Sequence, residues 1–164
     1  MSSFSSHNVS QPYRLRTAKT EKIRIAIVTS QWNDNITTPL RIGAAETLQV
    51  CEIPSQNIDF YEVPGAFELT YAAARLLRSK KYDAIIVLGC VIRGDTSHYD
   101  HICDGVSVGI TRLNTEGETP VIFGLVTTEN LQQALDRAGG VVGNKGSEAA
   151  ITALQMIDFS QQTK

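Results

Sequence analysis

From Ile23 onward, the spacing of hydrophobic residues alternates between two periods. Near-continuous apolar runs typical of buried strands cover residues 23–30, 57–63, 83–92 and 120–127. Segments whose apolar residues repeat at helical spacing cover residues 38–51, 66–79, 98–114, 129–138 and 144–158. Such alternation is typical of a parallel sheet with helices on both faces, because right-handed crossovers place helices over each side. The pattern predicts a three-layer αβα fold, of class α/β, around a four-stranded parallel sheet.

Local signals mark both ends of the helix expected over residues 129–138. Thr128 precedes Glu129, which predicts a helix capped by the threonine with a carboxylate in its first turn. The Gly139-Gly140 pair predicts where this helix ends.

The chain of 164 residues, 42% of them hydrophobic, is long enough for one compact domain with a substantial core. We expect this domain to cover residues 23–159. Residues 1–22 are expected to form an N-terminal tail or arm, and are a candidate for an extra N-terminal strand. Residues 160–164 are expected to be a C-terminal tail.

Composition argues against several classes of partner. A formal net charge of -2 gives no reason to expect binding to nucleic acid or to an anionic membrane. No apolar run approaches the roughly 20 residues of a membrane helix, and the N-terminus lacks the apolar core of a signal peptide. Its Ser-rich start, with no acidic residue before Glu21, also fits a transit peptide. The three cysteines form no C-x-x-C pair, so a reduced cytoplasmic protein is expected.

Candidate ligand-binding residues follow the four predicted strands, because open parallel sheets bind ligands beyond their carboxyl ends. Trp32 and Asn33 follow the first strand, and a Pro64-Gly65 turn with Phe67 and Glu68 follows the second. The segment RGDTSHYDH, residues 93–101, follows the third, and Arg137 lies beyond the fourth.

Each of these features also has a purely structural explanation. Trp32 is a candidate packing aromatic, Gly65 and Gly94 supply permissive turns, and Arg137 suits a solvated helix end. Their convergence on one edge of the sheet favours a ligand site.

The turn from Gly94 to Thr96 leads into a helix that begins near His98. Free backbone N–H groups and the positive end of the helix dipole then point to one spot, which predicts a phosphate cradle. The alternative is that Asp95, Thr96 or Ser97 only caps the helix. A phosphate beside Asp95 would need an offsetting cation, such as Arg93 or Arg137. Histidine exchanges protons readily near neutral pH, so His98 is a candidate acid/base.

A metal site is a further alternative. His98 and His101 lie three residues apart, with Asp95, Asp100 and Cys103 as further candidate ligands. This spacing lacks the i, i+4 histidines and the glutamate of the zinc-protease helix, and no second ligand cluster is visible. We therefore expect no bound metal.

Four motifs, in their order and spacing, resemble one known family. They are VPGAFEL, GCVIRGDTSHYDHI, PVIFGLVTTENLQQALDRAGG and GNKGSEAA. Together they resemble the 6,7-dimethyl-8-ribityllumazine synthase family of riboflavin biosynthesis, over residues 23–159. The resemblance implies a flavodoxin-like sheet, homopentamers and an active site between neighbouring subunits. It also implies a transferase without a cofactor, which joins 5-amino-6-(D-ribitylamino)uracil to 3,4-dihydroxy-2-butanone 4-phosphate and releases phosphate and water.

The resemblance further implies roles for individual residues. His98 matches the family's acid/base histidine, and Asn33 is placed to reach the ribityl chain. Trp32 matches the aromatic that stacks on the pyrimidine ring, and Phe123 matches an aromatic contributed by the adjacent subunit. The other substrate-binding positions are Ala66, Phe67, Glu68, Cys90, Val91 and Ile92. The phosphate-binding positions are Asp95, through its backbone N–H, Thr96 and Arg137.

The resemblance also concerns assembly. The short loop GGVVGN, residues 139–144, is similar to that of family members that close into icosahedral shells, so a shell is expected. Riboflavin synthase is a candidate partner.

His101 stands where the family often has an aromatic residue, which affects no step of the reaction. The alternative function is a flavin-binding or carrier shell protein that uses Trp32 stacking without catalysis.

Overall fold

The computed structural model describes residues 12–164 of the chain and has a parallel sheet at its centre. The sheet has four strands in the order β2-β1-β3-β4. Their bounds are Ile58–Val63 for β2, Ile25–Ser30 for β1, Ala84–Ile92 for β3 and Val121–Thr128 for β4. The predicted α/β fold with a four-stranded parallel sheet is confirmed.

The central strands are buried on both faces, which explains their near-continuous apolar sequences. Along β1, Ile25 and Ile27 face one hydrophobic cluster, whereas Ala26 and Val28 face the other. Ile25 pairs with Ile58 of β2 on one side and with Ala84 of β3 on the other. This register places the carboxyl ends of the strands along one edge of the sheet.

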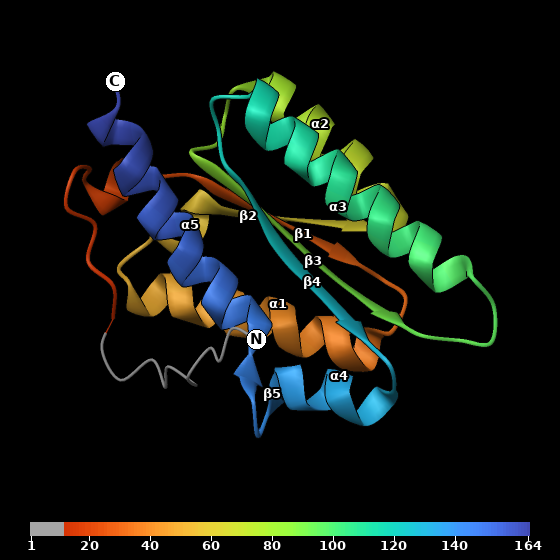
Figure 1. Cartoon of the computed structure of the whole chain (residues 1–164). Helices are drawn as coiled ribbons and strands as arrows, with labels where there is room; N and C mark the ends of the chain where they lie inside the picture. The colour runs from red at the N-terminus through yellow and green to blue at the C-terminus, as the bar shows by residue number, and fades with distance from the viewer. Residues whose placement is uncertain (1–11) are drawn as a thin grey trace.

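Helices cover both faces of the sheet (Figure 1). One face carries α1 (Asp34–Val50), α4 (Leu131–Arg137) and α5 (Lys145–Gln162). The other face carries α2 (Leu69–Ser79) and α3 (His98–Glu116). Buried aliphatic side chains between these layers make two clusters, one on each side of the sheet. Across residues 12–164, no helix combines the length and the apolar character needed to cross a membrane.

Several helices begin at different residues from those expected, most clearly α1 and α4. α1 begins at Asp34, four residues before the expected start at residue 38, and Pro39 lies inside it. Buried Ile36 and Thr37 hold this extra turn against the core. α4 is capped by the Asn130 side chain, which accepts a hydrogen bond from the Gln133 N–H. The prediction of Thr128 as the cap was wrong, because Thr128 still belongs to β4 and its hydroxyl donates to the Asn130 carbonyl.

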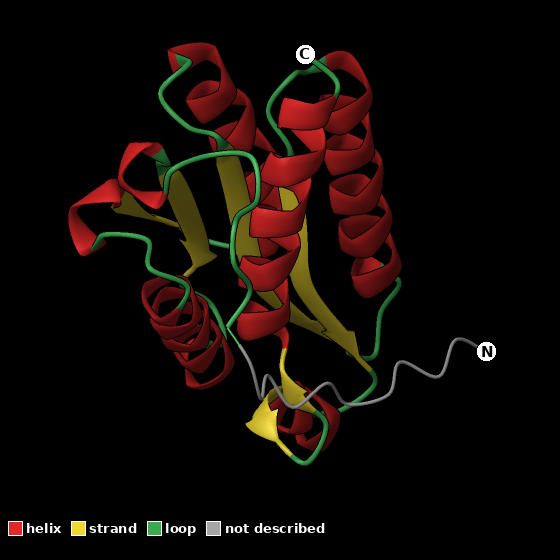
Figure 2. Ribbon diagram, turned by 90° about the vertical axis from the view of Figure 1, so that its left-hand side faces the viewer, coloured by secondary structure: helices red, strands yellow, loops and turns green. Residues whose placement is uncertain are grey.

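The segment after α4 forms a small antiparallel hairpin of β5 (Ala138–Gly140) and β6 (Gly143–Asn144). Gly139 and Gly143 have positive φ angles of 108° and 93°, a backbone conformation that favours glycine. The predicted end of the helix before Gly139 is confirmed. In Figure 2, α4 and the hairpin lie below the arrowheads of the sheet, at the end where the strands finish.

The chain termini differ in part from the expectation. Residues 12–22 contain a short 3-10 turn, Thr20–Lys22, and no strand; the rest of the segment considered for an extra strand lies outside the described residues. Tyr13 and Thr17 donate hydrogen bonds from their hydroxyls to Asp158 of α5. α5 itself continues to Gln162, into the segment expected to be a tail.

Candidate functional site

The loop after β1 is tied to the ends of both neighbouring strands. The Trp32 N–H donates to the Pro64 carbonyl at 3.0 Å, and the Asn33 side-chain amide donates to the Cys90 carbonyl at 3.2 Å. Asn33 also adopts the left-handed backbone conformation, with a φ of 59°, where the chain turns into α1. These bonds bring Trp32 and Asn33 beside the residues that follow β2 and the end of β3.

Trp32 lies against the backbone of Gly65. A Cβ atom at Gly65 would fall 2.5 Å from the Cε3 and Cζ3 atoms of the indole, so only glycine leaves room for the ring. The Gly65 N–H donates to Oε2 of Glu68 at 3.0 Å, which fixes the carboxylate beside the same turn. Trp32 is nevertheless 65% exposed, so its ring is available for stacking against a flat ligand.

The segment Ala66–Glu68 forms a single 3-10 turn before α2. Ala66 is buried, whereas the Phe67 ring lies against Gly105 of α3, with its Cε2 atom 2.9 Å from where a Cβ on that glycine would stand. Within residues 12–164, Oε2 is the one oxygen of Glu68 in a hydrogen bond, which leaves Oε1 free to accept from a ligand hydroxyl.

The end of β3 offers backbone groups rather than reactive side chains. Burial raises the pKa of the Cys90 thiol to about 11, so the thiol stays neutral at physiological pH. Val91 and Ile92 are half-buried and pair with Thr127 and Thr128 of β4. A buried thiol that stays neutral is a poor nucleophile, so this end of β3 offers mainly its backbone groups to a ligand.

The turn between β3 and α3 is exposed from Arg93 to His98. Ser97 occupies the cap position of α3 but makes no side-chain cap hydrogen bond. The Thr96 hydroxyl accepts from the His98 N–H at 3.4 Å, which is long for such a bond. Capping by these side chains is therefore weak, and the start of the helix can still offer N–H groups to an anion.

Arg137 is held by Glu148 of α5 through two parallel hydrogen bonds. Nη1 donates to Oε1 at 2.8 Å and Nη2 donates to Oε2 at 2.9 Å, while Nη1 also donates to the Val142 carbonyl at 3.2 Å. Within residues 12–164, Nε and the second Nη2 hydrogen have no hydrogen-bond partner. These two donors lie on the same side of the guanidinium, in the fork arrangement that suits two phosphate oxygens.

The charge of Glu148 is stabilised in the same contact. Partial burial raises the pKa of its carboxyl, but hydrogen bonds and charge from Arg137, with a smaller contribution from Lys145, outweigh burial and bring the pKa below its ordinary value. The carboxylate is thus ionised at neutral pH and keeps Arg137 in one orientation.

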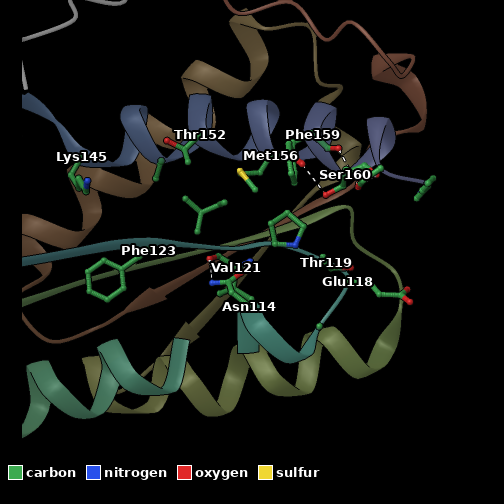
Figure 3. A pocket seen from close by; sticks show the side chains of 16 residues that line it. Asn114, Glu118, Thr119, Val121, Phe123, Lys145, Thr152, Met156, Phe159 and Ser160 are labelled. Atoms are coloured by element: carbon green, nitrogen blue, oxygen red, sulfur yellow. Dashed lines mark hydrogen bonds between the residues drawn. The ribbon is translucent and has the colours of Figure 1, made fainter. Parts of the chain in front are cut away.

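Phe123 lies apart from the other predicted site residues in this chain. It is 37% exposed on β4, an edge strand among the described strands, and lines a groove of about 820 Å³ between α3 and α5. Figure 3 shows Phe123 and Lys145 near one end of the groove, with Phe159 and Ser160 toward the other. Trp32, Glu68 and His98 are not among the described residues that line it.

The structure thus brings some predicted residues together and leaves others apart. Trp32 and Glu68 both lie against Gly65, Asn33 beside Trp32 is bonded to the end of β3, and the turn with His98 follows β3. Within residues 12–164, neither Arg137 nor Phe123 makes a hydrogen bond to any of these residues. In that part of the chain, no three His, Cys, Asp or Glu side chains are grouped so that they could hold a metal ion.

Sequence reasoning missed the partners that hold these residues. The packing of Trp32 against Gly65 and the pairing of Arg137 with Glu148 depend on segments that meet only in the folded chain. The GNKGSEAA motif, which contains Glu148, was the only available signal, and it carried no indication of which cation the carboxylate faces.

Comparisons with known proteins agree with one another. A family model described as 6,7-dimethyl-8-ribityllumazine synthase matches residues 22–161. The 6,7-dimethyl-8-ribityllumazine synthase of Phocaeicola vulgatus is 50% identical over 156 residues, which cover 95% of this chain and 93% of that relative. Proteins of the same name from Porphyromonas gingivalis and Flavobacterium johnsoniae are 55% and 47% identical, over 82% and 94% of this chain and 83% and 82% of their own lengths.

Proposed function

The chain belongs to the 6,7-dimethyl-8-ribityllumazine synthase family and is a transferase of riboflavin biosynthesis, and from this premise we propose the reaction and the roles of its residues. The family resemblance seen in the sequence is confirmed. The proposed reaction joins 5-amino-6-(D-ribitylamino)uracil to 3,4-dihydroxy-2-butanone 4-phosphate, giving 6,7-dimethyl-8-ribityllumazine, phosphate and two molecules of water. The observation that carries this proposal is the match over residues 22–161, together with an exposed indole and a carboxylate at the carboxyl edge of the sheet.

The pyrimidine substrate is proposed to stack on Trp32. The indole is exposed and fixed against Gly65, so a flat heterocycle gains contact without first having to order the ring. The backbone from Cys90 to Ile92 offers hydrogen-bonding groups to the pyrimidinedione edge. Asn33 and the turn Ala66–Glu68 are proposed to bind the ribityl chain, with the free oxygen of Glu68 accepting from a hydroxyl.

The phosphorylated substrate is proposed to bind the turn Asp95–Thr96 and Arg137. The weakly capped start of α3 supplies N–H groups, and Arg137 supplies its two free donors. Asp95 contributes its backbone N–H, because its carboxylate would repel the phosphate.

His98 is proposed as the acid/base for proton transfers between the substrates. The amine attacks the ketone carbonyl, and a first water leaves as the imine forms. Phosphate is then eliminated, which leaves a new carbonyl, and the second ring closes when the ribitylamino nitrogen attacks that carbonyl with loss of a second water. Each of these steps moves a proton near one place, and His98 stands at the exposed start of α3 beside the phosphate turn. Holding the two substrates together supplies a further part of the rate enhancement.

We propose that Phe123 and Arg137 serve the site of a neighbouring subunit. Within residues 12–164 of one chain, Arg137 bonds to Val142 and Glu148 rather than to the residues around Trp32, and Phe123 is exposed on an edge strand. A homopentamer places one such edge beside the next subunit's site, and a closed icosahedral shell of pentamers is favoured by the short turn between β5 and β6. Riboflavin synthase is proposed as a partner, and three unpaired cysteines support a cytoplasmic location.

Mixing both substrates with the purified protein tests the proposed reaction. Lumazine absorbance should appear only when both substrates are present, with one phosphate released for each lumazine formed. Tight flavin binding with no lumazine would instead support a carrier protein.

A further inference from the structure

The turn that carries the phosphate-binding groups has little packing of its own. Every residue from Arg93 to His98 is exposed, and a Cβ atom added at Gly94 would meet no other atom within 4 Å. Exposed turns without buried side chains sample several conformations unless other contacts restrict them. Phosphate binding and proton transfer nevertheless require Thr96 and His98 to stay at fixed positions.

The Arg93 side chain connects both ends of this turn. Its Nη2 and Nη1 atoms donate to the two carboxylate oxygens of Asp100, in the first turn of α3, at 3.0 and 3.3 Å. Its Nε atom lies 2.8 Å from Oε2 of Glu129, which follows β4. The guanidinium carbon also lies 4.2 Å from the centre of the Tyr99 ring, so the planar group is held on one face as well as along its edges.

The backbone of Arg93 is fixed at the same place. Its N–H donates to the Thr128 carbonyl at 2.8 Å, which continues the pairing of β3 with β4 to the first residue of the turn. One residue therefore joins the end of β3, the end of β4 and the start of α3.

Arg93 and Arg137 differ in what their guanidinium groups can still bind. Arg93 faces two carboxylates, Asp100 and Glu129, so its charge is already more than balanced. Arg137 faces the single carboxylate of Glu148 and keeps two donors free. The guanidinium of Arg93 is thus occupied by protein carboxylates, whereas that of Arg137 remains available to a phosphate.

We propose that Arg93 is a positioning residue that holds the phosphate-binding turn and the first turn of α3, and with them Thr96 and His98, in the geometry the reaction needs. This inference rests on the proposed function. A single exposed ion pair contributes little to stability, but a network of contacts on one planar group restricts geometry more than it stabilises the fold. Removal of Arg93 should therefore disturb binding of the phosphorylated substrate more than global stability.

Steady-state kinetics of Arg93→Ala and Arg93→Lys test this role. Arg93→Ala should raise the KM for the butanone phosphate by about tenfold or more and lower kcat, because misplacement by about 1 Å can cost about a hundredfold. The KM for the pyrimidine amine should stay within about twofold, since Trp32 and Glu68 are not contacted by Arg93. Arg93→Lys should recover only part of the loss, because an ammonium cannot bridge both carboxylates in a fork.

Arg112→Ala is the matched control. Arg112 pairs with Glu116 four residues away on the exposed face of α3, so its removal takes away an arginine–carboxylate pair from the same helix without touching the turn. This variant should keep both KM values. If Arg93→Ala does not fold, the pair of substitutions Asp100→Asn and Glu129→Gln removes the two carboxylates that hold Arg93 and should give the same selective rise in KM, with an unchanged circular dichroism spectrum.

Inorganic phosphate supplies an independent readout as a competitive inhibitor. Its inhibition constant should rise in Arg93→Ala in parallel with the KM for the butanone phosphate. Suppose the wild type is active but the Arg93→Ala or the Asp100→Asn/Glu129→Gln variant keeps the phosphate inhibition constant and both KM values. That result would overturn the role of Arg93 and leave the proposed function intact. A wild-type protein that forms no lumazine would instead overturn the proposed function.

Discussion

Arg137 and Glu148 meet through two parallel hydrogen bonds of 2.8 and 2.9 Å that leave one side of the guanidinium free. The carboxylate therefore orients the arginine without occupying the donors that a phosphate would use. In the proposed phosphate site, Glu148 would therefore assist binding even though it carries the same charge as the ligand.

Glu148→Gln tests this relationship. The amide keeps the size of the side chain but loses the charge, so Arg137 should lose its fixed orientation and the KM for the butanone phosphate should rise about tenfold, which corresponds to ~1.4 kcal/mol. Steady-state kinetics measures this change, with Glu116→Gln as the control because Glu116 pairs with Arg112 on exposed α3. A lower KM in Glu148→Gln would show that the carboxylate only competes with the phosphate.

His98→Ala tests the proton-transfer role. Turnover should fall by about 10²–10⁴-fold without being abolished, because substrate positioning remains. His101→Ala, which removes the neighbouring histidine of α3, should change turnover little. Unchanged kcat in His98→Ala, measured by lumazine absorbance at saturating substrates, would remove His98 from the mechanism.

Gly65→Ala tests the packing of the Trp32 ring against Gly65. The added methyl group would stand 2.5 Å from the indole, so the ring must move, and the KM for the pyrimidine amine should rise. Trp32 is the only tryptophan of the chain, so its fluorescence emission reports directly on this movement. Gly94→Ala, where the added Cβ meets nothing within 4 Å, should leave the emission unchanged. The same emission and the same KM in Gly65→Ala would contradict the contact.

Asp158→Asn tests the anchoring of residues 13–17. The Asp158 carboxylate is 2% exposed and accepts from the hydroxyls of Tyr13 and Thr17 and from the N–H groups of Arg16 and Thr17. An amide cannot accept all of these bonds, so the free energy of unfolding should fall by about 3 kcal/mol. Thermal unfolding measures the loss, and the exposed Asp104→Asn serves as control.

The pH dependence of this anchor follows from its pKa. Burial raises the pKa of the Asp158 carboxyl, but hydrogen bonds from Thr17, Tyr13 and two backbone N–H groups outweigh it and bring the pKa below its ordinary value of 3.8. The contribution to stability is therefore fully present above pH 3.8 and is lost as the pH falls through the lowered pKa. The difference in Tm between the wild type and Asp158→Asn should narrow in that acidic range, and a constant difference would contradict the anchor.

The fold was largely predictable because its central strands are buried on both faces. The apolar runs around Ile27 and Ile86 mark central strands without any tertiary information. The hairpin of β5 and β6 escaped prediction because it depends on the positive φ angles of Gly139 and Gly143, which a short glycine-rich segment does not reveal. The early start of α1 escaped because Ile36 and Thr37 are held by packing, ahead of a proline that normally marks a helix start.

The site was predictable only in outline. The rule that ligands bind at the carboxyl edge of a parallel sheet pointed to Trp32, Glu68 and His98 from sequence alone. Their supporting contacts were not predictable, because Arg93 meets Glu129 and Arg137 meets Glu148 only after distant segments pack together. Roles in the reaction came from the family resemblance rather than from spacing or composition.

A complementation experiment tests most directly the central claim, that each active site joins the Trp32 and His98 side of one chain to the Arg137 and Phe123 side of its neighbour. His98→Ala and Arg137→Ala, each of low activity alone, are co-expressed in equal amounts with different affinity tags, and mixed assemblies are isolated by both tags. Random arrangement in a ring should restore about one quarter of the wild-type activity, because that fraction of interfaces combines an intact His98 with an intact Arg137. If mixed assemblies are no more active than the separate variants, the two residues act within one chain and the shared site is contradicted.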